Sequence, residues 1–220
     1  QVSCSATRPH IESGYFSGWD DPRIPFLLAL KRRGYQPEAL IKYALSVGIS
    51  LNDKTVEMKE FFKTLNAFNK EILEPLSYRF FFVKNPVKIT IEHALHLELD
   101  LDLHPDNKKG GRIFSTNDTF YLQQEDIDQL KEGKLHRLMD CLNFKKHGKK
   151  YAFDSREYKA FKTKGDKIIH WLPADKKHLK DVEVLLENNT AIIGLGEANL
   201  EKISGGDIIQ FERFGFVRLE

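Results

Sequence analysis

The spacing of apolar residues changes near residue 80, and this change restricts the order of structures that the chain can form. From residue 61 to residue 76, apolar side chains recur every three or four positions, which is the spacing of one helix face. Between Leu95 and Leu103 every second residue is leucine and the others are His, Glu or Asp, which places one apolar face on a strand. The sequence therefore predicts an α+β protein in which helices precede sheets.

Start and stop residues divide the first 80 positions into four predicted helices. These helices span 6–13, 22–33, 37–47 and a fourth region that begins at Asn52 or Asp53. Asp20 and Asp21 stand where the second helix needs an N-cap, and Pro22 suits its first position because the missing N–H costs nothing there. The expected stops are Gly14, Gly34 and Gly48. Four helices joined by short loops predict a compact antiparallel bundle.

Short apolar segments, separated by glycine, asparagine and proline, fill the rest of the chain. Besides the leucine segment, the predicted strands are 80–83, 87–91, 119–122, 135–139, 167–171, 182–186, 208–211 and 216–219. Many short strands without long helices between them favour antiparallel barrels or a sandwich over a parallel sheet.

Charge and cysteine content exclude several classes of protein. The 34 lysines and arginines against 32 acidic residues leave a net charge of +2, so any nucleic-acid binding must come from local patches. Cys4 and Cys141 lack the spacing of a zinc site or a disulfide framework, which predicts a reducing, cytoplasmic setting and no bound metal. No apolar segment approaches the roughly 18 residues of a membrane span, so we expect no membrane partner.

Two further motifs carry little weight. The segment from Gly194 to Asn199 resembles a dinucleotide-binding loop, but it lacks the third glycine and a surrounding βαβ pattern. His93 and His96 are expected on opposite faces of a strand, so they should not share a metal. No histidine has a nearby partner in sequence that indicates a catalytic triad.

Arginines and a glutamine stand beside aromatic residues at predicted strand ends. Arg79 precedes Phe80–Phe82, and Arg137 lies in a short strand. Gln210 and Arg213 belong to the last predicted strand pair. Arginine and glutamine can recognise the edge of an unpaired base while an aromatic ring stacks on it, as in the binding of single-stranded RNA. The alternative is that these are ordinary arginines at sheet edges, paired with neighbouring carboxylates.

Four separated motifs resemble one family. Gly18–Arg23, with Lys31–Tyr35 and Pro37–Ala39, is similar to the GWDDPR, RRG and PEA segment of class I glutamyl- and glutaminyl-tRNA synthetases of the archaeal and eukaryotic type. The further motifs, in the order of the family, are VKNPVKI at 83–89, IIHW at 168–171 and QFER at 210–213. The resemblance covers nearly the whole chain, and Leu65–Lys70 with Phe80–Val83 looks more like the archaeal glutamyl enzymes.

The resemblance implies a helical stem-contact domain at residues 1–80 and an anticodon-binding region of two antiparallel β-barrels at 81–220. The tRNA-binding residues that it implies are Arg79, Arg137, Gln210, Arg213, Asp20, Asp21 and Arg32. Arg79, Gln210 and Arg213 would surround the central anticodon base, and Arg137 would lie near the first base. Met139 stands where the glutaminyl enzyme has a second arginine. The loop of Asp20 and Asp21 and its helix would face the inner side of the L-shaped tRNA.

Residues 1–5 align with the KMSKS-type loop of the family, which holds the ATP phosphates. The candidates in this chain are Val2, Ser3, Cys4 and Ser5, whereas Gln1 and Cys4 stand where the family has lysines. Lysines and backbone N–H groups suit such a loop because negative charge grows on the leaving pyrophosphate. The nucleotide-binding fold that precedes this loop in the family is not in the sequence. We therefore expect ATP with Mg²⁺ to bind only in the complete enzyme, and we assign no catalytic residue.

The resemblance implies the tRNA-binding part of a glutamate–tRNA ligase, which contributes to the ATP-dependent attachment of glutamate to tRNA. The chain alone should be inactive, and it should require a complementary catalytic chain or domain with a class I nucleotide-binding fold. It would be an excised fragment or one half of a split enzyme. Two alternatives stay open, which are a fragment of a glutaminyl-tRNA synthetase and a free-standing RNA-binding module without charging activity. Recognition of glutamine tRNAs in addition to glutamate tRNAs also stays open.

Overall fold

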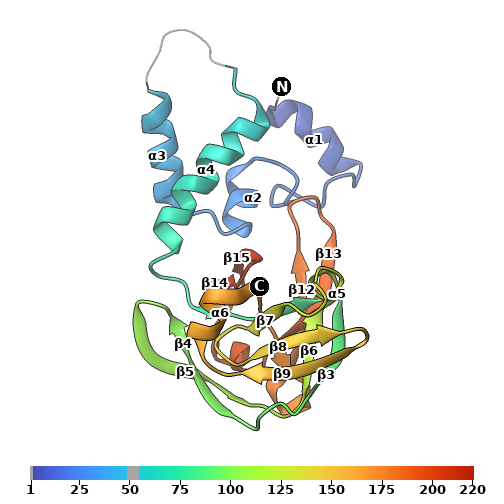
Figure 1. Ribbon diagram of the computed structural model, residues 1–220. Coiled ribbons are helices and arrows are strands. Elements are labelled where there is room, and N and C mark those ends of the chain that lie inside the picture. The colour runs from blue at the N-terminus through green and yellow to red at the C-terminus, as the bar shows by residue number, and fades with distance from the viewer. Residues whose placement is uncertain (1, 49–54) are drawn as a thin grey trace.

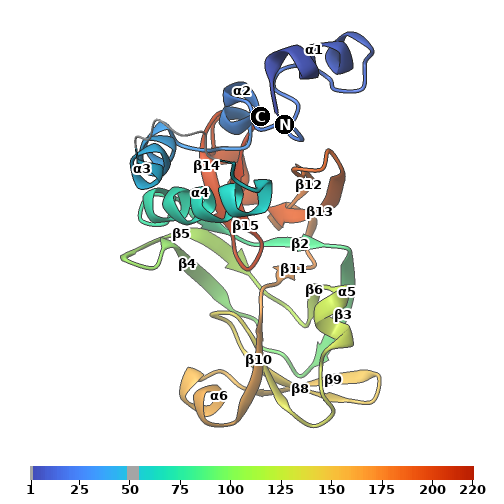
Figure 2. The same ribbon diagram turned by 90° about the horizontal axis from the view of Figure 1, so that it is seen from above.

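The computed structural model describes residues 2–48 and 55–220. Figure 1 shows an α+β chain with helices gathered at one end and strands at the other, in the predicted order. The last residues return to the helical end, where Glu220 lies beside Arg32 (Figure 2). Among the described residues, no helix has both the length and the apolar character needed to cross a membrane.

The helices of the first part are α1 (Cys4–Glu12), α2 (Leu27–Arg32), α3 (Pro37–Val47) and α4 (Met58–Leu73). The prediction for α3 is confirmed, because Pro37 begins it and Gly48 ends it with a φ of 71°. α1 begins two residues earlier than predicted, since the Ser3 hydroxyl accepts a hydrogen bond from the Ala6 N–H at 3.2 Å and caps the helix there. The predicted start of the fourth helix, at Asn52 or Asp53, lies outside the described residues.

The second helix starts later than predicted, and the reason is Asp21. α2 begins only after Phe26, which makes no side-chain hydrogen bond as its N-cap. The Asp21 carboxylate does not cap a helix, because it accepts hydrogen bonds from the backbone N–H groups of Ser17 and Arg23. The segment after Asp21 therefore forms turns, and the N-cap role predicted for Asp20 and Asp21 is wrong.

Three of the four helices share a core. Leu30 of α2, Ala39 of α3 and Leu65 of α4 are buried together. None of the described residues of α1 belongs to this cluster. A compact bundle of all four helices is therefore not confirmed.

The second part of the chain contains short strands and two short helices. The first strands are β1 (Arg79–Phe80), β2 (Phe82–Lys84), β3 (Pro86–Glu92), β4 (Glu98–His104), β5 (Asn107–Ser115), β6 (Thr119–Gln123), β7 (Leu135–Leu138) and β8 (Asn143–His147). The remaining strands are β9 (Lys150–Ser155), β10 (Gly165–Ile169), β11 (Leu172–Pro173), β12 (Leu179–Leu185), β13 (Ala191–Glu197), β14 (Ile208–Phe211) and β15 (Gly215–Arg218). The helices are α5 (Gln124–Asp128) and α6 (Tyr158–Lys164), with 3-10 turns at Lys176–His178 and Ala198–Lys202.

The strands form four sheets. Their orders are β1-β14-β15, β10-β7-β8-β9-β3-β6-β11, β12-β13-β2 and β4-β5. Three strand pairs are parallel, namely β1 with β14, β10 with β7, and β3 with β9. In the described part of the chain no sheet closes on itself, so two antiparallel β-barrels are not confirmed. The parallel pairs arise because strands far apart in the sequence meet, as when β1 leaves the helices and joins the last hairpin.

The leucine segment forms a shorter strand than predicted. Leu99 and Leu101 of β4 are buried, whereas Leu95 is 40% exposed before the strand begins. His93 turns the chain with a φ of 64°. His93 and His96 therefore lie in the connection between β3 and β4 and not on a strand, contrary to the prediction.

The apolar segment Phe80–Val83 lies where two cores meet. Phe81 and Val83 belong to the main core around Trp171, whereas Phe80 and Phe82 belong to a second core with Phe211. Successive side chains of an extended chain point to opposite sides, so a segment with a core on each side is apolar throughout. This arrangement explains why the segment shows no alternation in the sequence.

Candidate nucleic-acid interface

Two of the residues predicted to recognise RNA lie opposite each other in a sheet. β1 and β14 pair in parallel, and their register places Arg79 opposite Gln210. The backbone N–H groups of Gln210 and Glu212 donate to the carbonyl groups of Tyr78 and Phe80, at 2.8 and 2.9 Å. These hydrogen bonds hold Arg79 and Gln210 at adjacent positions, although they are far apart in the sequence.

Arg79 and Gln210 have hydrogen-bonding capacity that the protein does not use. Two Nη atoms of Arg79 lie 3.8 Å from Glu74 and 3.7 Å from Glu212, so the carboxylate neighbours of the alternative interpretation are present, at long distances. Among the described residues, the buried Nε of Arg79 and the buried Oε1 of Gln210 have no hydrogen-bond partner. Buried polar atoms without partners are rare because they are unfavourable. The two side chains as wholes are only partly buried, so their accessible polar groups can meet a donor and an acceptor on a base edge.

Arg213 contacts a different set of groups. It lies between β14 and β15 with a φ of 62°, and its guanidinium donates to both carboxylate oxygens of Asp126 in α5, at 2.9 and 2.7 Å. Lys167 lies 2.8 Å from the same carboxylate. Burial raises the pKa of Asp126, but hydrogen bonds from Arg213 and Lys167 outweigh burial and the net pKa is lowered. The structure therefore ties Arg213 to a buried carboxylate, and in its described part no hydrogen bond joins Arg213 to Arg79 or Gln210.

Arg213 also borders a polar pocket of about 370 Å³. The pocket is lined by Lys84, Gln123, Glu125, Asp126, Gln129, Lys167, Arg213 and Phe214. His170 lies beside it, with its Nδ1 atom 3.4 Å from Nη1 of Arg213. Burial, and then the positive charge of Arg213, lower the pKa of His170 to about 4. His170 is therefore neutral at pH 7, and its ring nitrogen accepts the hydrogen bond from Arg213.

Arg137 lies on β7 and is only 7% exposed. Its Nη1 atom donates to Oδ1 of Asn143 at 2.8 Å and to the carbonyl of Arg156 at 3.0 Å. Its Cζ atom lies 5.5 Å from the centre of the Tyr158 ring. Burial lowers the pKa of Arg137. Met139, two residues further on, packs against the main core.

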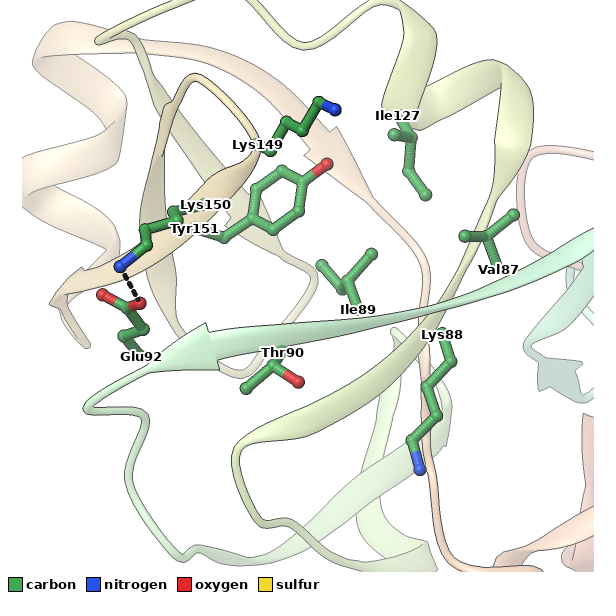
Figure 3. Close-up of a pocket in the computed structure, with 9 residues that line it drawn as sticks. All are labelled: Val87, Lys88, Ile89, Thr90, Glu92, Ile127, Lys149, Lys150 and Tyr151. Atoms are coloured by element: carbon green, nitrogen blue, oxygen red, sulfur yellow. Dashed lines mark ion pairs between the residues drawn. The ribbon is translucent and has the colours of Figure 1, made fainter.

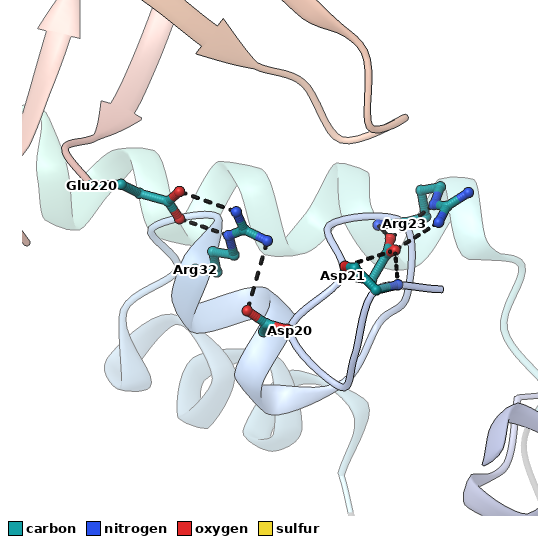
Figure 4. Close-up of polar contacts among 6 residues, drawn as sticks. Asp20, Asp21, Arg23, Arg32 and Glu220 are labelled. Carbon is teal, nitrogen blue, oxygen red and sulfur yellow. Dashed lines mark hydrogen bonds and ion pairs between the residues drawn. The ribbon is translucent and has the colours of Figure 1, made fainter. Parts of the chain in front are cut away.

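The loop before α2 is organised by Asp21 (Figure 4). Its buried carboxylate accepts hydrogen bonds from the N–H and hydroxyl of Ser17, and from the N–H, Nε and Nη2 of Arg23, at 2.7 to 3.2 Å. The side-chain hydrogen bond from Arg23 holds the pKa of Asp21 well below its ordinary value, against the effect of burial. Trp19 packs edge-on against Phe26, with ring centres 5.1 Å apart. Asp21 therefore acts within the loop.

Arg32 links the helical part to the end of the chain. Its Nε and Nη2 atoms donate to the carboxylate of Glu220 at 2.6 and 3.1 Å, and its Nη1 atom lies 3.7 Å from Asp20 (Figure 4). The side chains of Glu220 and Asp20 are more than half exposed. The tRNA-binding roles of Asp20, Asp21 and Arg32 stay predictions.

The predicted ATP-loop residues lie at the start of α1. Ser3 is the N-cap, Cys4 and Ser5 belong to the first turn, and Val2 precedes them with 50% exposure. Gln1 lies outside the described residues. The first turn of a helix leaves backbone N–H groups without helical partners, and such groups favour an anion.

A second pocket, of about 450 Å³, lies between β3, β9 and α5 (Figure 3). Val87, Ile89 and Tyr151 face it, whereas Lys88 extends from the opposite side of β3. An ion pair of 3.2 Å between Lys150 and Glu92 lies at one end. None of the predicted site residues lines this pocket.

Three neighbours of the predicted residues were not found from the sequence. Asp126 and Asn143 hold arginines, and neither belongs to a motif that marks it. Tyr158 stands between Glu157 and Lys159, so no basic segment marks it in the sequence.

Comparison with known proteins shows the family to which the chain belongs. Two family models, both described as the anticodon-binding domain of class I tRNA synthetases for glutamate and glutamine, match residues 77–161 and 168–220, which together make up more than half of the chain. Curated relatives named glutamate–tRNA ligase come from Methanobrevibacter smithii (35% identical over 222 residues), Pyrococcus furiosus (37% over 229) and Methanococcus maripaludis (37% over 225). Each match covers the whole of this chain but only 38–39% of the relative's length. The chain therefore belongs to the anticodon-binding family of the class I glutamyl- and glutaminyl-tRNA synthetases.

Proposed function

We propose that this chain is the tRNA-binding part of a cytoplasmic glutamate–tRNA ligase and that its sheets recognise the anticodon. The observation that carries the proposal is the register of β1 against β14, which places the partly exposed side chains of Arg79 and Gln210 at adjacent positions. Gln210 stands in a motif that resembles the family, Arg79 directly precedes another, and both lie inside the segments that the family models match.

In this proposal, residues 1–80 form the stem-contact domain and residues 81–220 form the anticodon-binding region. In this proposal, the two parts of the anticodon-binding region are built on the cores around Trp171 and Phe211, and neither part needs to be a closed barrel. Arg79 and Gln210 bind the central anticodon base along its hydrogen-bonding edge. Arg213, fixed by Asp126, supplies positive charge beside them.

The proposal requires a catalytic part with a nucleotide-binding fold, because residues 2–5 provide only backbone N–H groups, hydroxyls and a thiol toward ATP. Bound ATP with Mg²⁺ would supply the activation of glutamate in the complete enzyme. Residues 2–5 would then cap the phosphates from the start of α1. Mixing this chain with a catalytic part, ATP, glutamate and tRNA should give aminoacylation that neither part gives alone. No charging by the mixture would contradict this part of the proposal.

Filter binding tests the recognition of the anticodon. A glutamate tRNA transcript is compared with a transcript in which only the central anticodon base is replaced. We expect the change of base to weaken binding by about 1–3 kcal/mol. Gln210→Glu should abolish this difference, because the new carboxylate can pair with Arg79 and no amide is left to complement the base. Arg213→Ala should weaken binding to the glutamate transcript.

The matched control is Lys202→Ala, which removes an exposed cation from the same half of the chain and should leave the difference between the two transcripts unchanged. Equal binding of both transcripts by the unmodified chain would overturn the assignment of the site. Retention of the difference in Gln210→Glu would do the same.

A further inference from the structure

The pocket between β3, β9 and α5 lies where one strand of the largest sheet lacks a neighbour (Figure 3). β3 pairs with β6 along Pro86–Thr90, but its pairing with β9 is limited to Ile91 and Glu92. The reason is that β9 begins only at Lys150. In the described part of the chain, Pro86–Thr90 therefore has a strand on one side and none on the other, and we call this segment the open edge of β3.

The open edge carries backbone groups that the sheet does not use. The N–H of Ile91 donates to the carbonyl of Asp118 at 2.8 Å, so Ile91 and every second residue before it direct their backbone groups toward β6. Lys88 and Thr90 direct theirs the other way. Among the described residues, no strand accepts from the N–H groups of Lys88 and Thr90. An unpaired strand edge of this kind is a template for a further strand.

Apolar side chains line the pocket beside the open edge. Val87 and Ile89 face it from β3, Ile127 faces it from α5, and Tyr151 closes it from β9 (Figure 3). The volume of about 450 Å³ is in the range of ligand-binding sites. Successive side chains of a strand point to opposite faces of its sheet. A strand added to the open edge would therefore direct every second side chain into this pocket.

The charge around the pocket is positive. Lys88, Lys149 and Lys150 line it, and the one acidic residue of the lining, Glu92, is already paired with Lys150 at 3.2 Å. Lys88 and Lys149 are exposed, and neither has an ion pair in the described part of the chain. A second copy of the open edge would bring like charges together, whereas a segment that carries carboxylates would be attracted.

We propose that the open edge of β3 binds an extended, acidic segment of a partner protein, which joins the sheet as a further strand. Its backbone pairs with the N–H groups of Lys88 and Thr90, its apolar side chains enter the pocket, and its carboxylates meet Lys149. RNA fits less well, because it has no peptide groups to pair with a strand and the pocket is mainly aliphatic. The proposal goes beyond the proposed function, since none of the residues predicted to bind tRNA lines the pocket.

Fluorescence anisotropy with a labelled synthetic peptide, in which glutamate alternates with valine, tests the site. We expect the chain to bind this peptide about tenfold more tightly than a peptide in which lysine replaces glutamate. Methylation of the backbone nitrogens of the glutamate peptide should abolish its binding, because the strand hydrogen bonds are lost. Equal affinity for the glutamate and lysine peptides, or no binding of the glutamate peptide up to about 1 mM, would overturn the proposal.

Lys149→Glu tests the charge of the site. It should weaken binding of the glutamate peptide about fivefold, since repulsion replaces attraction. The matched control is Lys108→Glu, which reverses an exposed lysine on β5 that does not line the pocket. The control should leave the affinity unchanged. An equal loss of affinity in Lys149→Glu and Lys108→Glu would show attraction to the whole surface and would overturn the site.

Thr90→Pro tests the strand pairing. Proline removes the N–H that faces the pocket and leaves the pairing with β6 intact, so binding should weaken roughly tenfold. Thr90→Ala keeps the N–H and should bind as the unmodified chain does. Equal binding by a folded Thr90→Pro variant would contradict the proposal, and urea unfolding shows whether the variant is folded. Hydrogen exchange of the unmodified chain gives a second measurement, in which the peptide should slow exchange of the Lys88 and Thr90 amides. Unchanged exchange would also contradict the proposal.

The same variants distinguish the other occupants. Displacement of the peptide by single-stranded polyuridylate, with weaker binding of that RNA in Lys149→Glu, would assign the open edge to RNA and overturn the proposal. A dimer of the unmodified chain in sedimentation that Thr90→Pro separates would assign it to a second copy, with the same consequence. If the peptide does not bind while Gln210→Glu still loses base preference, only this proposal fails, and the proposed function stands.

Discussion

Two regions of the molecule place an arginine against an exposed tyrosine, and they differ in what neutralises the arginine. In the loop before α2, Arg23 lies over Tyr15 and makes three hydrogen bonds to the buried carboxylate of Asp21. On β7, Arg137 lies over Tyr158 and meets only neutral oxygens. The first arrangement uses its arginine to hold a loop. The second leaves positive charge and donor atoms for a ligand.

The same difference extends to the other arginines. Arg112, on β5, is 4% exposed and is fully paired with the buried Glu197, whereas Arg79 has only ion pairs of 3.7 and 3.8 Å. Arg112 is neutralised inside the protein and contributes to the fold, whereas Arg79 keeps hydrogen-bonding capacity that the described residues do not use.

The largest expected effect is the loss of stability when the Arg112–Glu197 pair is broken. Nε of Arg112 donates to both oxygens of Glu197 at 3.1 Å, and the backbone N–H of Phe81 donates to the same carboxylate at 2.5 Å. Glu197→Gln leaves the charge of Arg112 buried without a counter-ion, so we expect a loss of about 3–5 kcal/mol in the free energy of unfolding. Urea denaturation measures it. Glu201→Gln, which breaks the exposed pair with Lys180, is the control and should change stability by less than about 1 kcal/mol. Equal losses of stability in Glu197→Gln and Glu201→Gln would contradict the distinction between the buried pair and the exposed pair.

The second expected effect is the pH dependence contributed by His170, the neutral neighbour of Arg213. Its pKa is lowered to about 4, against about 6.5 in an unfolded chain. Between these values the unfolded chain binds a proton that the folded chain does not bind, so the contribution to stability is complete above pH 6.5 and decreases as the pH falls toward 4. The decrease amounts to about 3 kcal/mol, since one pKa unit corresponds to roughly 1.4 kcal/mol.

Urea denaturation at a series of pH values measures the contribution of His170. His170→Gln should reduce the slope of stability against pH between 4 and 6.5. An unchanged slope in His170→Gln would show that His170 titrates normally.

Asp21→Asn gives a smaller effect and separates folding from binding. In this variant the NH₂ group of the Asn side chain would face N–H groups of Ser17 and Arg23, which are themselves donors. At least one buried donor would then lack an acceptor. We expect a loss of about 1–3 kcal/mol in the free energy of unfolding. Because Asp21 acts inside its loop, the ratio of affinities for the two tRNA transcripts should stay the same. A loss of base preference in this variant would assign the loop a direct role in anticodon recognition.

The smallest effect is expected for Arg32→Ala. Its partners Glu220 and Asp20 are more than half exposed, so the stability should change by no more than about 1 kcal/mol. A double-mutant cycle with Glu220→Ala measures the coupling between the two side chains. A coupling well above this value would place Arg32 with the tightly paired arginines.

Local signals in the sequence predicted local structure. Pro37 and Gly48 mark the two ends of α3 as expected. The fixed φ of proline favours the start of a helix, the permissive φ of glycine favours its end, and both effects act within a few residues. The predicted strand at 208–211 matches β14 for the same kind of reason, since the turn residues Gly205, Gly206 and Asp207 that precede it also act locally. Asp21 shows the limit, because a carboxylate before a helix can cap it or bind other nearby donors, and here the donors of Ser17 and Arg23 bind it.

The candidate site could be predicted only in part. The motifs indicated Arg79, Gln210, Arg213 and Arg137, but their partners come from distant segments. Neither the parallel pairing of β1 with β14 nor the hydrogen bonds from Arg213 to Asp126 leaves a periodic pattern in the sequence. The counter-ion of an arginine is a property of the fold, so the distinction between loosely and tightly paired arginines required the structure.

The measurement that tests the central claim most directly is cross-linking of a glutamate tRNA that carries thiouridine in its anticodon loop. After irradiation, mass spectrometry identifies the peptides joined to the RNA. We expect cross-links in peptides that contain Arg79, Gln210 and Arg137, and none from these nucleotides to α1 to α4. Cross-links of the anticodon loop to α1 to α4 alone would contradict the proposal that the sheets recognise the anticodon.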